Sequence, residues 1–291
     1  MFDIPWYIFA LLSAFFVALA SVIEKKVLVH DEPMHFSLSA VVILGILSLP
    51  FLFFIPWNNL TLEMLGTIYL ISILAFVAFA LVAYSLKRLE AGEQSLILAT
   101  TPVVNAFFAY VAIAEELTRY AFLGLCLIVA GLIVLELPRL KGRTSTLKAK
   151  FAPIGLSFLA VCVYAGSAVL DRVVLKTHLV SAFDFIMLTQ SFMLLNVLVI
   201  YGVQGKITKD ILTSFFKKPF HLAFFSLSML MSRLLYAQSV SMAYVALTAV
   251  LKRTGALMTI FMARSYLHEK HLGHKLLAGA IVILGVLLVI L

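Results

Sequence analysis

The chain has few charged residues and almost no cysteine. Only 12% of its 291 residues are Asp, Glu, Lys or Arg, and two are cysteine. The low charge excludes a soluble domain, because a core of this size could not bury 63% hydrophobic residues at a mean hydropathy of +1.11. Cys126 and Cys162 both fall in apolar stretches, so we expect no disulfide. An integral membrane protein is predicted.

Motifs for nucleotide or metal chemistry are also missing. The sequence has no phosphate-binding glycine loop and no nucleotide-binding domain, which excludes an ATP-driven pump within this chain. His268, His271 and His274 have helix-like spacing, but the segment 267–271 is one residue short of the zinc motif HExxH. We therefore expect no metal site, no cofactor and no enzymatic activity.

Apolar stretches of about 20 residues, the length that crosses a hydrocarbon core as an α-helix, recur along the whole chain. They run at 5–24, 36–56, 65–86, 94–114, 119–137, 153–173, 182–203, 219–239, 242–264 and 273–291. The prediction is an all-α polytopic membrane protein with ten transmembrane helices, surrounded by a lipid bilayer.

The second half of the sequence repeats features of the first in the same order. The pairs Glu24-Lys25 and Asp171-Arg172 end apolar stretches. Tyr84, either Glu115 or Glu116, and Gly131 correspond to Tyr236, Glu269 and Gly285. The offset drifts from about 147 to about 154 residues, as expected for a duplication with one longer loop. We predict five-helix repeats at 1–138 and 153–291, joined by a basic loop at 139–152. An odd helix number inverts the second repeat relative to the first, which is typical of transporters that work by alternating access.

The distribution of Lys and Arg predicts the orientation. When loops are assigned alternately to two sides, the loops after the fifth and seventh helices concentrate basic residues on one side. Since Lys and Arg favour the cytoplasm, we expect a cell (inner) membrane protein with both termini extracytoplasmic. Topology explains the net charge of +8, so no nucleic-acid partner is expected.

Residues 80–136 resemble a known repeat unit. The segments Ala80–Ser85, Glu90-Ala91-Gly92, Thr101-Pro102-Val103 and Glu115–Thr118, followed by Gly124 and Gly131, are similar to the drug/metabolite transporter superfamily in its ten-helix EamA-type branch. The resemblance implies a proton-coupled or exchange carrier with a central cavity lined by helices 1, 3, 4, 6, 8 and 9. Ala256 stands where the first repeat has Pro102, so we expect helix 9 to be straighter than helix 4.

Two adjacent cations in helix 9 are the sharpest chemical signal. Lys252 and Arg253 lie about halfway along the apolar stretch 242–264, where each costs roughly 2.5 to 3.5 kcal/mol on insertion scales. Such a cost indicates a partner, and we expect an anionic group of a substrate in a hydrated cavity. The Leu-Lys-Arg step also resembles helix 9 of the plastid triose-phosphate translocators. The alternative is a structural ion pair with Glu24, Asp171 or Glu116.

Further polar residues extend the predicted site. Besides Lys252 and Arg253, we expect substrate-binding roles for a set of polar and basic residues in helices 3, 4 and 8, namely Arg233, Tyr236, Tyr84, Thr101 and Asn105. Interhelical hydrogen bonding is the alternative for these residues, and it is our interpretation of Gln190 and Asn196. Glu115, Glu116 and Glu269 are expected to cap the helix that follows them.

The paired charges near the ends of helices 1 and 6 are candidates for gating or proton coupling. They are Glu24 with Lys25 and Asp171 with Arg172, which the inverted repeat would place at opposite membrane faces. Solvation of helix ends is the simpler alternative.

Small residues in helices 5 and 10 predict close packing. Gly124 and Gly131 in one, and Gly273, Gly279 and Gly285 in the other, allow helices to approach closely. We expect this contact inside one chain, with a homodimer as the alternative.

Together these features predict a secondary-active transporter of a small, anionic metabolite. One alternative is a proton-coupled exporter of amino acids or cationic drugs, which would need the helix 9 cations paired within the protein. The other is a non-transporting membrane protein, for which duplicated inverted halves have no obvious use.

Overall fold

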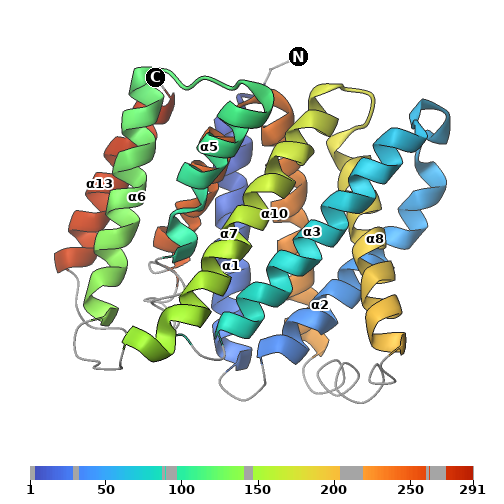
Figure 1. The fold of residues 1–291 in the computed structure, drawn as a ribbon, viewed down its shortest axis with the longest axis horizontal. Helices are drawn as coiled ribbons and strands as arrows, with labels where there is room; N and C mark the ends of the chain where they lie inside the picture. Colours follow the sequence, from blue (N-terminus) through green and yellow to red (C-terminus); the bar gives the residue numbers. More distant parts are fainter. Residues whose placement is uncertain are drawn as a thin grey trace.

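The computed structural model describes residues 4–28, 33–86, 89, 97–140, 147–203, 219–259, 262 and 273–290. All regular secondary structure within these ranges is helical. The helices form one bundle in which α1 begins and α13 ends at the same end (Figure 1). We refer to this end as the terminal end of the bundle.

The helices follow the apolar stretches of the sequence closely. They are α1 (Trp6–Leu28), α2 (Pro33–Ser48), α3 (Leu62–Leu86), α5 (Thr101–Ile113), α6 (Arg119–Leu140), α7 (Leu147–Lys176), α8 (Ala182–Val203), α10 (Pro219–Met242), α11 (Val245–Arg253) and α13 (Gly273–Ile290), with short 3-10 segments η1 (Leu49–Phe54) and η2 (Trp57–Asn59). The stretch at 36–56 is not one α-helix as expected. Its α-helical part ends at Ser48 and continues as η1, because Pro50 lacks the backbone N–H that an α-helix would use there.

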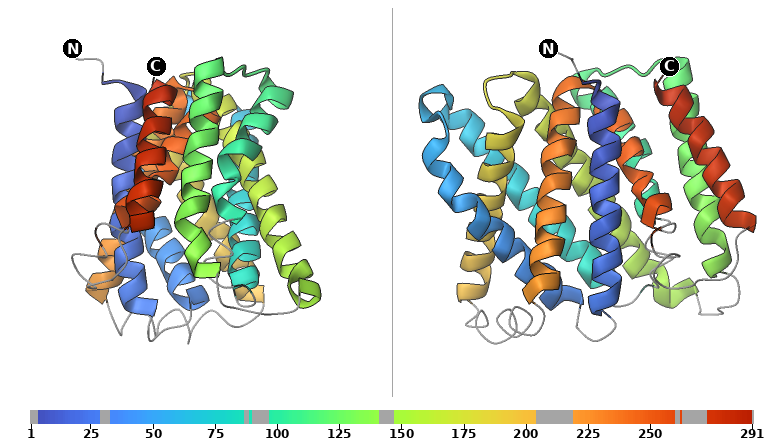
Figure 2. Two further views of the ribbon diagram at one scale, coloured as in Figure 1. Left: turned by 90° about the vertical axis from the view of Figure 1, so that its left-hand side faces the viewer. Right: turned by 180° about the vertical axis from the view of Figure 1, so that it is seen from behind.

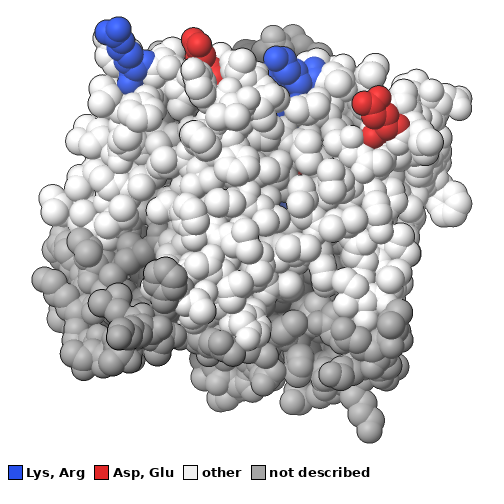
Figure 3. All heavy atoms as spheres, in the orientation of Figure 1, with Lys and Arg blue, Asp and Glu red and all other residues white. Residues whose placement is uncertain are grey.

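The outer surface of the bundle is apolar. Phe53 and Phe220 are 89% and 87% exposed, and many other large apolar side chains also point outward. On the face in Figure 3 the charged side chains in view lie mainly along the rim of the terminal end. Within the part of the chain that the structure describes, five helical segments are long and apolar enough to cross a membrane, at Trp6–Glu24, Leu62–Val82, Ala152–Lys176, Ala182–Ile200 and Pro219–Met242. Shorter apolar helices accompany them at Leu38–Phe54, Thr101–Ile113, Arg119–Val134 and Leu277–Ile290.

The most extensive contacts join a helix from one half of the chain to a helix from the other half. α1 packs along α10, and α3 packs along α7. α5 contacts α7 and α11, while α11 also contacts α1. The remaining large contacts are α2 with α8 and α6 with α13 (Figures 1 and 2). The two halves of the chain are therefore interleaved and bury their faces against each other.

Serine hydroxyls bridge two of the most extensive interhelical contacts. Between α1 and α10, Ser13 Oγ lies 2.8 Å from the carbonyl oxygen of Ser232, and Ser232 Oγ lies 3.0 Å from that of Ser13. Between α3 and α7, Ser157 Oγ lies 2.8 Å from Ser85 Oγ. Small hydroxyl residues let the backbones approach and supply a polar bond that lipid cannot provide. Asn196 of α8 also bonds Ser72 of α3, at 3.0 Å, which confirms its expected interhelical role.

Glycines bring α6 and α13 into backbone contact. A Cβ atom on Gly124 would lie 2.6 Å from the carbonyl oxygen of Gly285, and one on Gly131 would lie 2.6 Å from a methyl group of Val282. Gly279 faces open space. The expectation that these glycines pack inside one chain is confirmed for Gly124, Gly131 and Gly285.

Replacing Gly124 by alanine tests this contact. The new methyl group would meet backbone, which cannot rotate away, so α6 and α13 must separate and we expect a loss of about 1 to 3 kcal/mol in stability. The matched control is Gly279→Ala, which adds the same methyl group to open space and should gain helix propensity. Thermal unfolding in detergent compares the two variants. Equal midpoints for both would contradict the contact.

Candidate functional site

Two helices are interrupted at corresponding positions. A turn at Thr100 separates α5 from the helical residues 97–99, and a turn at Thr254 separates α11 from the helical residues 255–259. Helix 9 is therefore not continuous although it lacks the proline, and whether it is straighter than helix 4 stays a prediction. Pro102 is not required for the break, because the second helix breaks without a proline at the corresponding place.

The two turns share the same hydrogen bonds. The backbone N–H and the hydroxyl of Thr100 both donate to the carbonyl of Ile97, at 3.1 and 2.7 Å. Thr254 donates in the same two ways to Leu251, also at 3.1 and 2.7 Å. Each threonine carbonyl then accepts from the amides three and four residues later. The threonine hydroxyl supplies the local bond that stabilises a tightened turn in each half.

The break in α11 places the two cations deep in the bundle. α11 starts at the terminal end and has nine residues, so it descends about 14 Å, roughly half of a hydrocarbon core (Figure 2). Lys252 and Arg253 form its last turn, where positive charge offsets the negative end of the helix dipole. α5 begins at Thr101 beside them, so its positive end points to the same region.

Lys252 and Arg253 reach toward different helices. Arg253 Nη2 donates to Thr101 Oγ1 of α5 at 3.0 Å. The Lys252 ammonium lies over the ring of Tyr236 of α10, 4.1 Å from its centroid. This cation–π contact partly compensates for the water that the ammonium loses. The roughly 100° between adjacent helix positions thus spreads the two charges across the space between α5 and α10.

Arg233 of α10 joins the same cluster. Its Nη1 atom donates to Gln190 Oε1 of α8 at 3.0 Å and lies 3.5 Å from the sulfur of Met193. Lys252 interacts electrostatically with Arg233, Arg253 and Asp171. Tyr164 of α7 interacts with both arginines. We call Arg233, Lys252, Arg253 and Asp171 the charge cluster.

The cations of this cluster have no close carboxylate partner. Among the described residues, the ion pair within 4.0 Å joins Arg172 to Glu115 and involves none of the three cations. The alternative in which Glu24, Asp171 or Glu116 neutralises Lys252 and Arg253 directly is therefore not observed. All four cluster residues are half-buried, since part of each side chain remains accessible although it belongs to the interior of the bundle.

Several buried polar atoms near the cluster have no hydrogen-bond partner. They are Asp171 Oδ1, Gln190 Nε2 and Asn105 Oδ1, within the part of the chain that the structure describes. Gln190 uses its oxygen for Arg233, which leaves its amide nitrogen unused. Unpaired buried polar atoms are costly, so groups of this kind indicate a water or ligand that completes the bonding.

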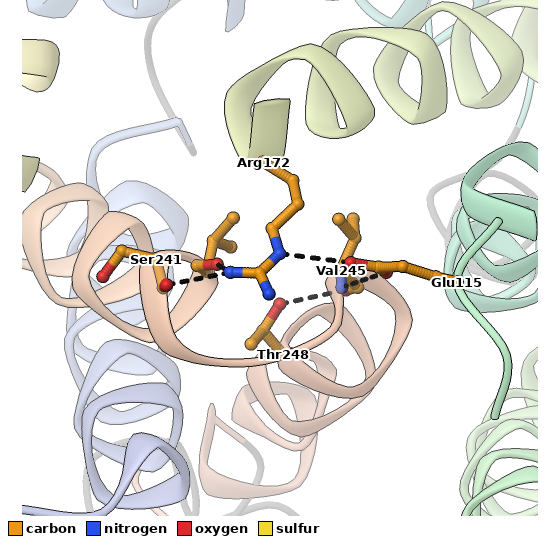
Figure 4. Close-up of polar contacts among 6 residues, drawn as sticks. Glu115, Arg172, Ser241, Val245 and Thr248 are labelled. Atoms are coloured by element: carbon orange, nitrogen blue, oxygen red, sulfur yellow. Dashed lines mark hydrogen bonds and ion pairs between the residues drawn. The ribbon is translucent and has the colours of Figure 1, made fainter. Parts of the chain in front are cut away.

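A second polar centre lies at the terminal end. Figure 4 shows Arg172 of α7 reaching into the turn between α10 and α11. Its Nη1 atom donates to the carbonyl oxygens of Val240 and Ser241 at 2.6 and 2.8 Å, and its Nε atom donates to Glu115 Oε1 at 3.1 Å. Arg172 thus satisfies carbonyls that the end of α10 leaves unpaired.

Glu115 closes the other side of this centre. Its Oε2 atom accepts from the amide of Val245, the first residue of α11, at 3.2 Å. Glu115 was expected to cap the helix that follows it, and this is wrong: it caps α11 in the other half of the chain. Ala114 adopts a left-handed conformation with φ of 52°, which ends α5 and turns Glu115 inward. We call Arg172, Glu115 and the α10–α11 turn the terminal clamp.

The other predicted residues lie elsewhere. Tyr84 is 46% exposed in the last turn of α3, far from the terminal end, and its substrate role stays a prediction. Glu24 is half-buried near the end of α1 that lies opposite the clamp (Figure 1). Glu116 is exposed, while Glu269 and the side chain of Lys25 lie outside the described residues.

Sequence reasoning missed Tyr164 and the partnership of Glu115 with Arg172. No local pattern reveals a contact between residues 57 positions apart. The signal in the sequence that could have pointed to Arg172 was its position directly after Asp171, a residue of the charge cluster. Gln190, expected to bond between helices, does so with Arg233, and this also matches the alternative of an interhelical bond for Arg233.

Comparisons with known proteins agree with this architecture. A solved structure, titled only as the crystal structure of a protein, shares the fold with a TM-score of 0.69, at 14% identity over 97% of this chain and 94% of that chain. No curated protein sequence matches. Residues 4–137 match the model of the EamA-like transporter family, whose members are membrane transporters of small molecules and not enzymes. The matched part of the chain is thus similar to the EamA-like transporter family, which is consistent with the drug/metabolite transporter superfamily.

Proposed function

We propose that this protein is a secondary-active carrier of small anionic metabolites that works by alternating access. The proposed architecture is ten transmembrane helices in two inverted repeats, 1–138 and 153–291. The helix contacts support it. In the two repeats α1 corresponds to α7, α3 to α10 and α5 to α11. The contact of α1 with α10 therefore has its counterpart in that of α7 with α3, and the contact of α5 with α7 in that of α11 with α1. The matching turns at Thr100 and Thr254 support it further.

The proposal of an anionic substrate rests on the three cations that lack a carboxylate partner. Arg233, Lys252 and Arg253 converge from α10 and α11 with no carboxylate within 4.0 Å among the described residues. Arginine guanidinium groups form two-pronged bonds to carboxylate or phosphate, and a lysine adds a point charge. Discontinuous helices whose ends point at the substrate are a recurring feature of such carriers.

The terminal clamp acts as the gate on one side of this site. It joins α7, the end of α5 and the α10–α11 turn through one buried ion pair. The bias of Lys and Arg toward the opposite end favours an extracytoplasmic position for the clamp in the cell membrane. Opening toward that side requires the bond between Arg172 and Glu115 to break.

Ligand-induced stabilisation tests the anionic substrate. The protein in detergent is heated alone and with sugar phosphates, nucleotide sugars, dicarboxylates, amino acids or cationic drugs. Anions should raise the unfolding midpoint, because a ligand at one hundred times its Kd adds about 2.7 kcal/mol to the stability of the folded state. Lys252→Ala and Arg253→Ala should lose this gain.

The same panel identifies the competing function. If amino acids or cationic drugs stabilise the parent and both variants equally, the cations are structural and the exporter of amino acids or cationic drugs replaces our proposal. Anions that stabilise all three proteins alike would place the binding site elsewhere.

The gate is tested by the reactivity of a cysteine beneath the clamp. Thr248 is fully buried under the α10–α11 turn, where it bonds to Val245 and also shares a side-chain hydrogen bond with Tyr236. We expect Glu115→Gln, in a Thr248→Cys protein without Cys126 and Cys162, to increase labelling by a membrane-impermeant maleimide about tenfold. Each ~1.4 kcal/mol lost from the closed state changes the open-to-closed ratio by that factor.

Glu116→Gln is the matched control, because it removes a neighbouring carboxylate that is exposed. It should leave the labelling rate unchanged. A Glu115→Gln protein that labels no faster than this control would show that the ion pair does not hold the gate closed.

A further inference from the structure

We infer that the substrate is a small dianion that also carries a hydrogen-bond donor, such as a hydroxyl group, and that Asp171 determines this specificity. The inference rests on the proposed function and extends it from anions in general to one class of anions. Three independent features of the charge cluster lead to it: the balance of charge, the unused donors of the arginines, and the unpaired oxygen of Asp171.

The balance of charge favours two negative charges on the substrate. Arg233, Lys252 and Arg253 are three cations, and Asp171 is the carboxylate that interacts with Lys252 and Arg233 among the described residues. When all four groups are ionised, the empty site carries an excess of two positive charges. An excess charge is expensive where water is scarce. A dianion cancels it, whereas a monoanion leaves one charge and a trianion creates the opposite excess.

The arginines retain donors for such a group. Arg253 uses one bond to Thr101, and the Nη1 atom of Arg233 serves Gln190 and Met193. A guanidinium has five N–H donors, so most of those in the site are unassigned by these contacts. Tyr164 interacts with both arginines, and Lys252 also interacts with both. The three cations thus lie within electrostatic range of one another, so the two negative charges of the substrate should be close together.

The donor requirement comes from Asp171. Its Oδ1 atom is buried without a hydrogen-bond partner, and among the described residues the carboxylate forms no ion pair within 4.0 Å. A carboxylate accepts bonds and donates none, so a group with an O–H or N–H must complete it. Asp171 therefore favours binding of a substrate that has a hydrogen-bond donor and disfavours binding of one that has a third negative charge.

The experiment measures binding of a charge series to the purified full-length protein. Malate is a dianion with a hydroxyl, succinate lacks the hydroxyl, lactate has one charge, and tricarballylate has three at neutral pH. Glycerol 3-phosphate carries its two charges on phosphate and separates this source of charge from dicarboxylates. Dissociation constants come from the rise of the unfolding midpoint with ligand concentration. We expect malate or glycerol 3-phosphate to bind at least tenfold more tightly than lactate or tricarballylate.

Asp171→Asn tests the specificity residue. The amide has nearly the same shape, lacks the negative charge and can itself donate. We expect the preference for malate over succinate to shrink several-fold and the relative affinity for tricarballylate to rise about tenfold. Glu116→Gln is the control, because it changes the net charge equally at an exposed site and should keep the parent's order.

The possible results separate the two levels of the proposal. Equal binding of lactate and malate, or an unchanged order in Asp171→Asn, overturns the dianion inference while the anion carrier stands. If neither dianion binds but amino acids or cationic drugs stabilise the protein, both the inference and the proposed function are wrong. Because Asp171→Asn could lower stability, all constants are compared as ratios within one protein.

Discussion

The burial of three cations in a bundle surrounded by apolar surface is the constraint on which the rest of the structure depends. A single charge at this depth is costly, so each cation needs local compensation. Arg253 has Thr101, Lys252 has the ring of Tyr236, and Arg233 has Gln190. These neutral contacts lower the free-energy cost of burying each cation but do not cancel its charge. In the proposed carrier, the site therefore still attracts an anion. The breaks at Thr100 and Thr254 follow from the same need, because they bring helix ends to the cluster.

α7 connects the charge cluster with the terminal clamp. Asp171 and Arg172 are adjacent and point about 100° apart, so one faces the cluster and the other the α10–α11 turn. α11 makes a second connection, since Glu115 caps its first residue and Lys252 and Arg253 form its last turn. A shift of α11 that follows neutralisation of its cations would therefore reach the clamp through a rigid helix of nine residues. In the proposed carrier, α7 and α11 couple the binding site to the gate directly, and a longer chain of contacts is not required.

Periodicity and composition predicted the helices because membrane spans need long apolar stretches, and the charged exceptions within them were visible in the sequence. Arg233 and Lys252 are two of these exceptions, and their role in binding, like that of Tyr236, stays a prediction. The departures come from tertiary structure. The turn at Thr254 depends on a threonine hydroxyl and not on proline, and Gly255 there lies against the backbone of Ala14, at 2.6 Å for an added Cβ atom. Glu115 caps a helix 130 residues away, a partnership that local capping rules cannot reveal.

The charge balance also constrains the transport cycle. In the proposed carrier, an empty site with two excess positive charges would resist closing on both sides at once, because closure removes the water that stabilises those charges. A bound dianion would remove the excess, so the loaded carrier would pass through the closed state more easily than the empty one. A ligand shifts such an equilibrium only by its different affinity for the two states, and here the difference is the cost of burying uncompensated charge. Strict exchange of one anion for another follows when the empty carrier crosses too slowly to compete.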